Sequence, residues 1–74
     1  MLNMEIILKP YQTVTFYHGE ATNEYDVQIT NSEKDSFVKI EYEKMDHLNL
    51  YSCHYISNEL IVHIFFTRYE VRNL

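Results

Sequence analysis

The chain has few of the residues that build helices, sharp turns and covalent cross-links. Its 74 residues include one glycine, one proline, one cysteine and no tryptophan. Because Cys53 is alone, a disulfide within the chain is excluded, and a reducing compartment is favoured. Alanine, the strongest helix former, occurs only at position 21, whereas β-branched and aromatic residues are abundant. The composition therefore predicts a small all-β protein without internal covalent support.

Basic charge is scarce as well. The chain has 6 lysine and arginine residues against 11 aspartate and glutamate residues, which gives a net charge of −5. This balance repels nucleic acid and anionic membranes and favours a basic partner. The start of the sequence lacks the basic segment and long apolar run of a signal peptide, and no apolar stretch reaches the length of a membrane span. We therefore expect a cytoplasmic protein.

The hydrophobic pattern predicts one domain, residues 1–74, made of antiparallel strands separated by polar turns. The six predicted strands are residues 4–9, 13–17, 24–30, 37–44, 48–56 and 60–69. The apolar phase slips within 48–56, which predicts a bulge, and the tail 70–74 is expected to fray. Because short turns join consecutive strands, we expect a six-stranded meander that forms a small barrel or a sheet that packs into a dimer.

The last predicted strand is apolar on both of its faces. Alternate side chains of a strand point to opposite sides of the sheet, and a strand that is apolar on both sides needs cover on both. One face can pack on the chain's own strands, but in a monomer the other face stays exposed to solvent unless the sheet closes into a barrel. We therefore predict a homodimer whose interface contains Ile61, His63 and Phe65.

Candidate metal ligands and nucleophiles are few. Cys53 and His54 are adjacent, so on a strand they point to opposite faces. A site combining Cys53 with His47 or His63 requires a cross-strand register that the sequence does not establish. The chain has no C-x-x-C or H-x-x-x-H pair to anchor zinc, and no glycine-rich turn to build an oxyanion hole beside Cys53. We therefore predict no catalytic residue, no metal site and no cofactor, and expect that the protein is not an enzyme.

The aromatic residues suggest a nucleic-acid-binding surface as one alternative. Seven tyrosines and four phenylalanines are present, and bases stack on sheet-borne aromatic rings in small barrels. Such surfaces also need clustered lysine and arginine, which are dispersed here. Most of the aromatic residues share the strand phase of valine and isoleucine, which is typical of core and interface packing. We therefore expect no direct contact with nucleic acid.

The acidic residues predict a partner-binding face. Two carboxylates share the outward face of predicted strand 37–44, two precede it in a turn, and two lie near the start of predicted strand 24–30. If these two strands form a hairpin, all six merge into one surface. Outward side chains recur about every 6.7 Å along a strand, about twice the roughly 3.4 Å phosphate spacing of one DNA strand. The face would then imitate DNA and bind a basic protein. Its residues are Glu24, Asp26, Glu33, Asp35, Glu41 and Glu43.

The alternative for this acidic face is a solvated surface that keeps a β-rich protein soluble. Lys34, Lys39 and Lys44 interrupt the negative field and favour that alternative.

The size and composition of the chain also suggest an origin. The chain is small and acidic, and it is rich in residues that are encoded by AT-rich codons. As a class, the chain resembles the small early proteins with which bacteriophages disable host machinery, some of which are DNA mimics. The resemblance implies an inhibitor that acts in the host cytoplasm on a DNA-binding protein, without assigning any residue. Two further functions stay open. One is an assembly subunit that oligomerises through the apolar C-terminal strand, and the other is a nucleic-acid-binding barrel that uses its tyrosines.

Overall fold

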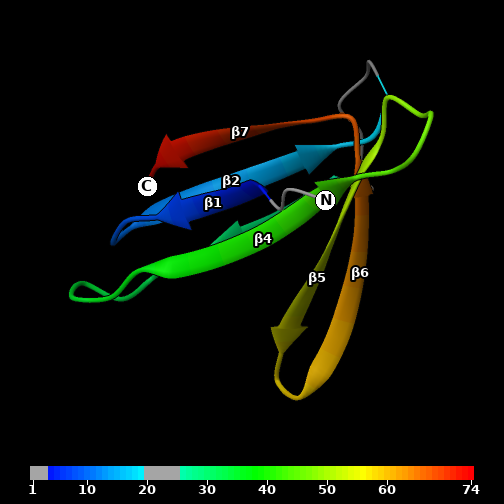
Figure 1. Cartoon of the computed structure of the whole chain (residues 1–74). Helices are drawn as coiled ribbons and strands as arrows, with labels where there is room; N and C mark the ends of the chain where they lie inside the picture. The colour runs from blue at the N-terminus through cyan, green and yellow to red at the C-terminus, as the bar shows by residue number, and fades with distance from the viewer. Residues whose placement is uncertain (1–3, 20–25) are drawn as a thin grey trace.

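The structure, a computed structural model, describes residues 4–19 and 26–74, and this part of the chain contains seven strands. In chain order they are β1 (Met4–Leu8), β2 (Gln12–Tyr17), β3 (Val27–Thr30), β4 (Val38–Lys44), β5 (Tyr51–Ser57), β6 (Leu60–Phe66) and β7 (Arg68–Asn73) (Figure 1). No helix in the described part is long and apolar enough to cross a membrane.

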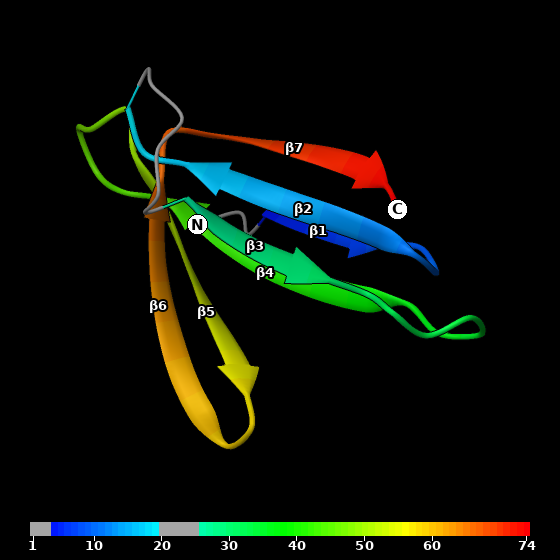
Figure 2. The ribbon, with the colours of Figure 1, turned by 180° about the vertical axis from the view of Figure 1, so that it is seen from behind.

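The strands form two antiparallel sheets, one of four strands in the order β1-β4-β5-β6 and one of three in the order β3-β2-β7. The prediction of an all-β antiparallel fold is confirmed. The predicted six-stranded meander is wrong, because the chain changes sheets three times instead of adding each strand beside the last. The two sheets do not close into a barrel. Seen from both sides, the β5–β6 hairpin projects away from the other strands (Figures 1 and 2).

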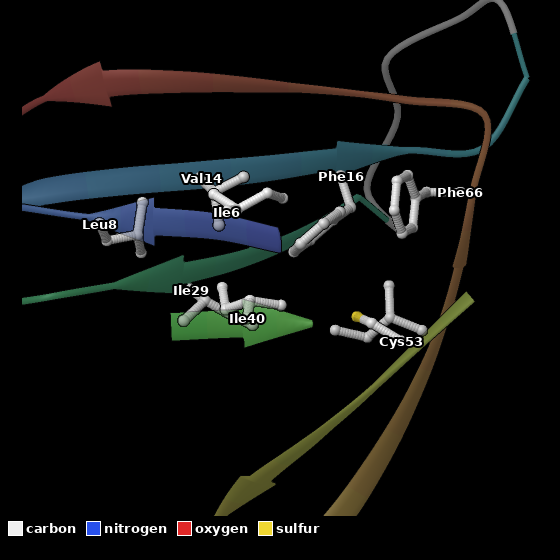
Figure 3. Packing of buried hydrophobic residues seen from close by; sticks show 9 residues of the cluster. Ile6, Leu8, Val14, Phe16, Ile29, Ile40, Cys53 and Phe66 are labelled. Carbon is white, nitrogen blue, oxygen red and sulfur yellow. The ribbon is translucent and has the colours of Figure 1, made fainter. Parts of the chain in front are cut away.

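The hydrophobic core lies between the two sheets. Strand β4 shows the alternation that builds it, since Ile40 is buried while its neighbours Lys39 and Glu41 are exposed. Side chains from both sheets meet in the same cluster, with the rings of Phe16 and Phe66 in contact at a centroid distance of 4.7 Å (Figure 3). The buried cluster consists of Ile6, Leu8, Val14, Phe16, Ile29, Ile40, Cys53, Ile64 and Phe66.

The turn between β1 and β2 carries the chain from the first sheet to the second. Pro10 ends β1 because it cannot donate to a strand ladder. Tyr11 follows with a φ of 61°, and the backbone N–H of Gln12 donates to the carbonyl of Lys9 at 3.2 Å. The predicted end of the first strand is therefore confirmed. The next strand, however, pairs with β3 and β7 instead of with β1.

The second crossing, from β3 to β4, is held by the buried side chain of Asn31. Its Nδ2 donates to the carbonyls of Leu8 at 3.3 Å and Ser36 at 2.9 Å. Its Oδ1 accepts from the backbone N–H of Glu33 at 3.2 Å and from the Ser36 hydroxyl at 3.3 Å. One amide thus ties β1 to the connection between β3 and β4.

The third crossing is a corner at Thr67, where β6 ends and β7 begins. The Thr67 backbone N–H donates to the carbonyl of Tyr17 at 2.8 Å, and its hydroxyl accepts from the N–H of Gly19 at 3.1 Å. The predicted strand 60–69 is therefore two strands in different sheets. The tail predicted to fray is most of β7, which pairs with β2 along its whole length.

The remaining connections shape the four-stranded sheet. Residues 45–50 link β4 to β5, and the N–H of Met45 donates to the carbonyl of Leu50 at 2.8 Å. The apolar phase slip attributed to a bulge lies at the boundary between this connection and β5. The two-residue turn between β5 and β6 has positive φ at both Asn58 (51°) and Glu59 (66°), as a type I′ hairpin requires.

Candidate functional site on the outer face of the four-stranded sheet

On the side of the four-stranded sheet that faces away from the core, the chemistry of the exposed side chains differs from strand to strand. Strand β4 presents carboxylates, the middle of the β5–β6 hairpin presents imidazoles, and the end of the hairpin presents aliphatic side chains. Each of these residues alternates with an inward neighbour such as Ile40, Cys53 or Ile64. We call this surface the outer face; on β4, β5 and β6 its exposed residues are Lys39, Glu41, Glu43, His54, Ile56, Ile61, His63 and Phe65.

A hollow of about 510 Å³ lies in the outer face between the end of β4 and the hairpin. Ser52, which is buried, contributes to its lining. Carboxylates from Glu43 and Asp46 share the hollow with the ring of Phe65. Neither carboxylate forms an ion pair with another described residue. The complete lining is Glu43, Lys44, Met45, Asp46, Ser52, His54, His63 and Phe65.

Two imidazoles and a phenyl ring meet at this hollow. The register of the hairpin places His54 directly opposite His63, and their ring centroids are 4.1 Å apart. Phe65 stacks on His63 at 4.4 Å with an angle of 30° between the ring planes. The sequence did not reveal this group because it did not fix the register. The register also places Cys53 opposite Ile64, away from the imidazoles.

Lys39 links two of the acidic residues near the hollow. Its Nζ lies 3.2 Å from Glu41 Oε1 and 3.3 Å from Glu5 Oε2. Hydrogen bonds to Glu41 and then to Glu5 raise the pKa of Lys39. All three side chains are about half exposed, so the cluster contributes little to stability. Lys39 thereby offsets one of these two negative charges, and Glu43 and Asp46 add two more beside the positive charge of Lys44.

The predicted acidic face does not form through a hairpin of the third and fourth predicted strands. Strand β3 pairs with β2, whereas β4 pairs with β1 and β5. Asp26 precedes β3 in the three-stranded sheet, so it does not share a sheet with Glu41 and Glu43. Glu24 lies outside the described residues. Glu41 and Glu43 are exposed on one side of β4, as predicted.

The turn residues Glu33 and Asp35 are exposed, but they precede β4, whereas Glu43 lies near its end. About 17 Å of extended strand separates Val38 from Glu43, at about 3.4 Å per residue. The structure therefore separates the described members of the predicted set into three regions: Asp26 before β3, the connection between β3 and β4, and the exposed side of β4. Their partner-binding roles stay predictions.

The predicted dimer residues share one surface. Ile61, His63 and Phe65 are all exposed on the outer face of β6, and β6 is the last strand of its sheet. Their participation in a dimer stays a prediction.

The chemistry of Cys53 favours a structural role. Its side chain is buried within the core cluster, and burial raises the pKa of its thiol. A thiol in such surroundings is a poor nucleophile and a poor metal ligand, because the reactive form is the thiolate.

Three tyrosines surround the buried ring of Phe66, next to the corner at Thr67 where the chain passes from one sheet to the other. The ring centroids of Tyr42, Tyr51 and Tyr69 lie 5.4, 5.6 and 6.2 Å from that of Phe66. Burial, and next a hydrogen bond with Tyr69, raise the pKa of Tyr42 to about 12. These rings pack on one another and on the core, which favours a structural role over the stacking of bases.

Comparison with protein-family models, with curated proteins and with solved structures found no match for this chain. The geometry and charge of the chain's own residues are therefore the basis for a proposed function.

Proposed function

We propose that this protein is a non-enzymatic protein-binding module that engages a basic partner through the outer face of its four-stranded sheet. The observation that carries the proposal is the hollow, which combines two carboxylates that have no ion-pair partner among the described residues with aromatic rings. Glu43 and Asp46 supply negative charge, while Phe65 and His63 supply flat surfaces beside it.

This combination suits a lysine or arginine side chain of a partner. A guanidinium or ammonium group would pair with Glu43 and Asp46, while its apolar stem or planar head packs on Phe65. The exposed aliphatic residues Ile56 and Ile61 continue the same surface toward the end of the hairpin. An apolar centre flanked by charged groups is the usual make-up of a specific protein interface.

The charge distribution supports a basic partner more broadly. Three of the six basic residues are already held in ion pairs: Lys39 with Glu5 and Glu41, and Arg68 and Arg72 with Glu70. The overall charge of −5 would accelerate encounter with a positively charged protein. The resemblance to bacteriophage takeover proteins suggests that this partner is a host nucleic-acid-binding protein and that the contact inhibits it.

The test is capture of a partner from bacterial lysate by the immobilised protein. We expect the captured protein to be basic and to elute as salt rises, because salt screens exposed charge pairs. Reversing two charges with Glu43→Lys and Asp46→Lys should abolish capture without unfolding the protein. Glu33→Lys with Asp35→Lys makes the same change in net charge on exposed residues away from the hollow, so comparing the two variants decides which of these predicted groups contacts the partner; the proposal expects this second variant to be captured as the wild type is. Equal capture by both double variants would refute the proposal.

A second function, assembly of this chain with itself, is supported by the end of the β5–β6 hairpin. Ile56, Leu60 and Ile61 are 68, 69 and 69% exposed there, and the outer edge of β6 pairs with no other described strand. Unpaired apolar edges are ready to pair with another chain. Burying two such side chains is worth ~3–6 kcal/mol. Ile56→Lys with Ile61→Lys should therefore weaken self-association at least a hundredfold in a sedimentation experiment, whereas a wild-type protein that stays monomeric would exclude this function.

A further inference from the structure

The two histidines on the outer face can bind a ligand of a different kind from the basic side chain of a protein partner. We propose that His54 and His63 form a two-imidazole chelating site for a divalent transition-metal ion such as Zn²⁺. Imidazole is a preferred ligand of such ions. The sequence predicts no metal site, because it does not fix the register that places these two residues opposite each other.

The geometry of the hairpin provides the chelate. Directly opposed residues on one face of an antiparallel pair have Cβ atoms about 4.5–5.5 Å apart. The two ring centroids lie 4.1 Å apart, at an interplanar angle of 43°. Zinc–nitrogen bonds of about 2.05 Å at a tetrahedral angle require two nitrogens about 3.3 Å apart. Both side chains are exposed, so the proposed site requires rotamers that place one nitrogen of each ring at that separation.

The surroundings of the pair favour a cation and hold one of the rings. Glu41 and Glu43 line a shallow hollow together with His54, so negative charge lies on one side of the site. Phe65, which shares the larger hollow with Glu43, stacks on His63 at 4.4 Å. A ring that is already packed loses less rotational freedom when it binds metal, which strengthens the chelate.

The coordination is incomplete within one chain. Among the described residues, no group of three or more histidine, cysteine, aspartate or glutamate side chains gathers at one point. Water fills the remaining positions in the isolated protein, which gives an open site that a further ligand can enter. A bound ion would also add positive charge to the hollow that contains Glu43 and Asp46, and so oppose the entry of a basic side chain.

The experiment is a titration of the purified wild-type protein with zinc chloride by calorimetry, with NMR observation of the imidazole ring signals. We expect one ion per chain and ring-signal changes confined to His54 and His63. His54→Ala and His63→Ala should each weaken binding about tenfold or more, because chelation needs both rings. His18→Ala is the matched control, since it removes an exposed histidine outside the pair and should bind as the wild type does.

Three outcomes would overturn the site. They are no heat of binding at millimolar zinc, wild-type affinity in either single variant, or displacement of zinc by equimolar magnesium. Magnesium prefers oxygen ligands, so its competition would show that carboxylates hold the ion. The titration uses the protein alone, so its failure would leave the proposed binding of a basic partner untouched.

Discussion

Replacing Asn31 with alanine should destabilise the protein far more than its place in a polar surface turn suggests. The side chain makes four hydrogen bonds, two through Nδ2 to the carbonyls of Leu8 and Ser36 and two through Oδ1. Leu8 is fully buried and Asn31 is 2% exposed, so water cannot easily replace the amide there. Asn31→Ala would leave these carbonyls without their donor at the crossing between the sheets.

The magnitude follows from the burial of the partners. An unsatisfied buried group costs about 1–3 kcal/mol, and the donors at Glu33 and Ser36 can recover water because they are closer to the surface. A loss of about 2–4 kcal/mol is therefore expected, with most of it from the two carbonyls. A 74-residue protein has a total stability of roughly 4–11 kcal/mol at about 0.05–0.15 kcal/mol per residue. The variant should thus lose between about a fifth and nearly all of its stability.

Urea unfolding followed by far-UV circular dichroism measures this loss. With a slope of about 1 kcal/mol per molar urea for a small domain, the midpoint should fall by about 2 M or more. Ser32→Ala, at the exposed neighbouring position, is the control and should stay within about 0.5 kcal/mol of the wild type. If Asn31→Ala unfolds at the same urea concentration as Ser32→Ala, the hydrogen-bonded crossing does not hold the two sheets together.

Other predictions concern titration, reactivity and association. Burial and a hydrogen bond with Tyr69 raise the pKa of Tyr42 to about 12, so absorbance titration should show a late-ionising tyrosine that Tyr42→Phe removes. Because the unfolded state ionises first, stability should decline as pH rises from about 10 toward 12. The raised pKa of the buried Cys53 thiol predicts slow reaction with a disulfide reagent at pH 8 and fast reaction in urea. Light scattering should show reduced self-association when Ile56 or Ile61 is replaced by lysine.

The strands could be predicted from the sequence, because the alternation of apolar and polar residues indicates directly which side chains are buried. Strand β4 illustrates this, since its inward Ile40 and outward Glu41 follow from the pattern alone. The topology was not predictable in the same way. A turn such as Lys9–Pro10–Tyr11 has the composition of a hairpin turn, yet it leads to the opposite sheet. Local composition specifies that the chain turns, whereas long-range packing decides which strand it meets.

The candidate site was predicted only in part for the same reason. Glu41 and Glu43 were placed outward correctly, because their positions depend on one strand. The opposition of His54 and His63 depends on the register of a hairpin, and that register is fixed by the two-residue turn at Asn58 and Glu59. The importance of Asn31 arises from partners 5 and 23 residues away, which no local pattern reveals.

The most direct test of the proposed function is an NMR footprint of the captured partner on the isotopically labelled protein. Amide signals should change around the residues that line one hollow, while signals in the three-stranded sheet stay in place. The residues expected to respond are Glu43, Asp46, His54 and Phe65. Changes confined to the three-stranded sheet or to the loop containing Glu33 would contradict the account, because the partner would then bind away from the outer face.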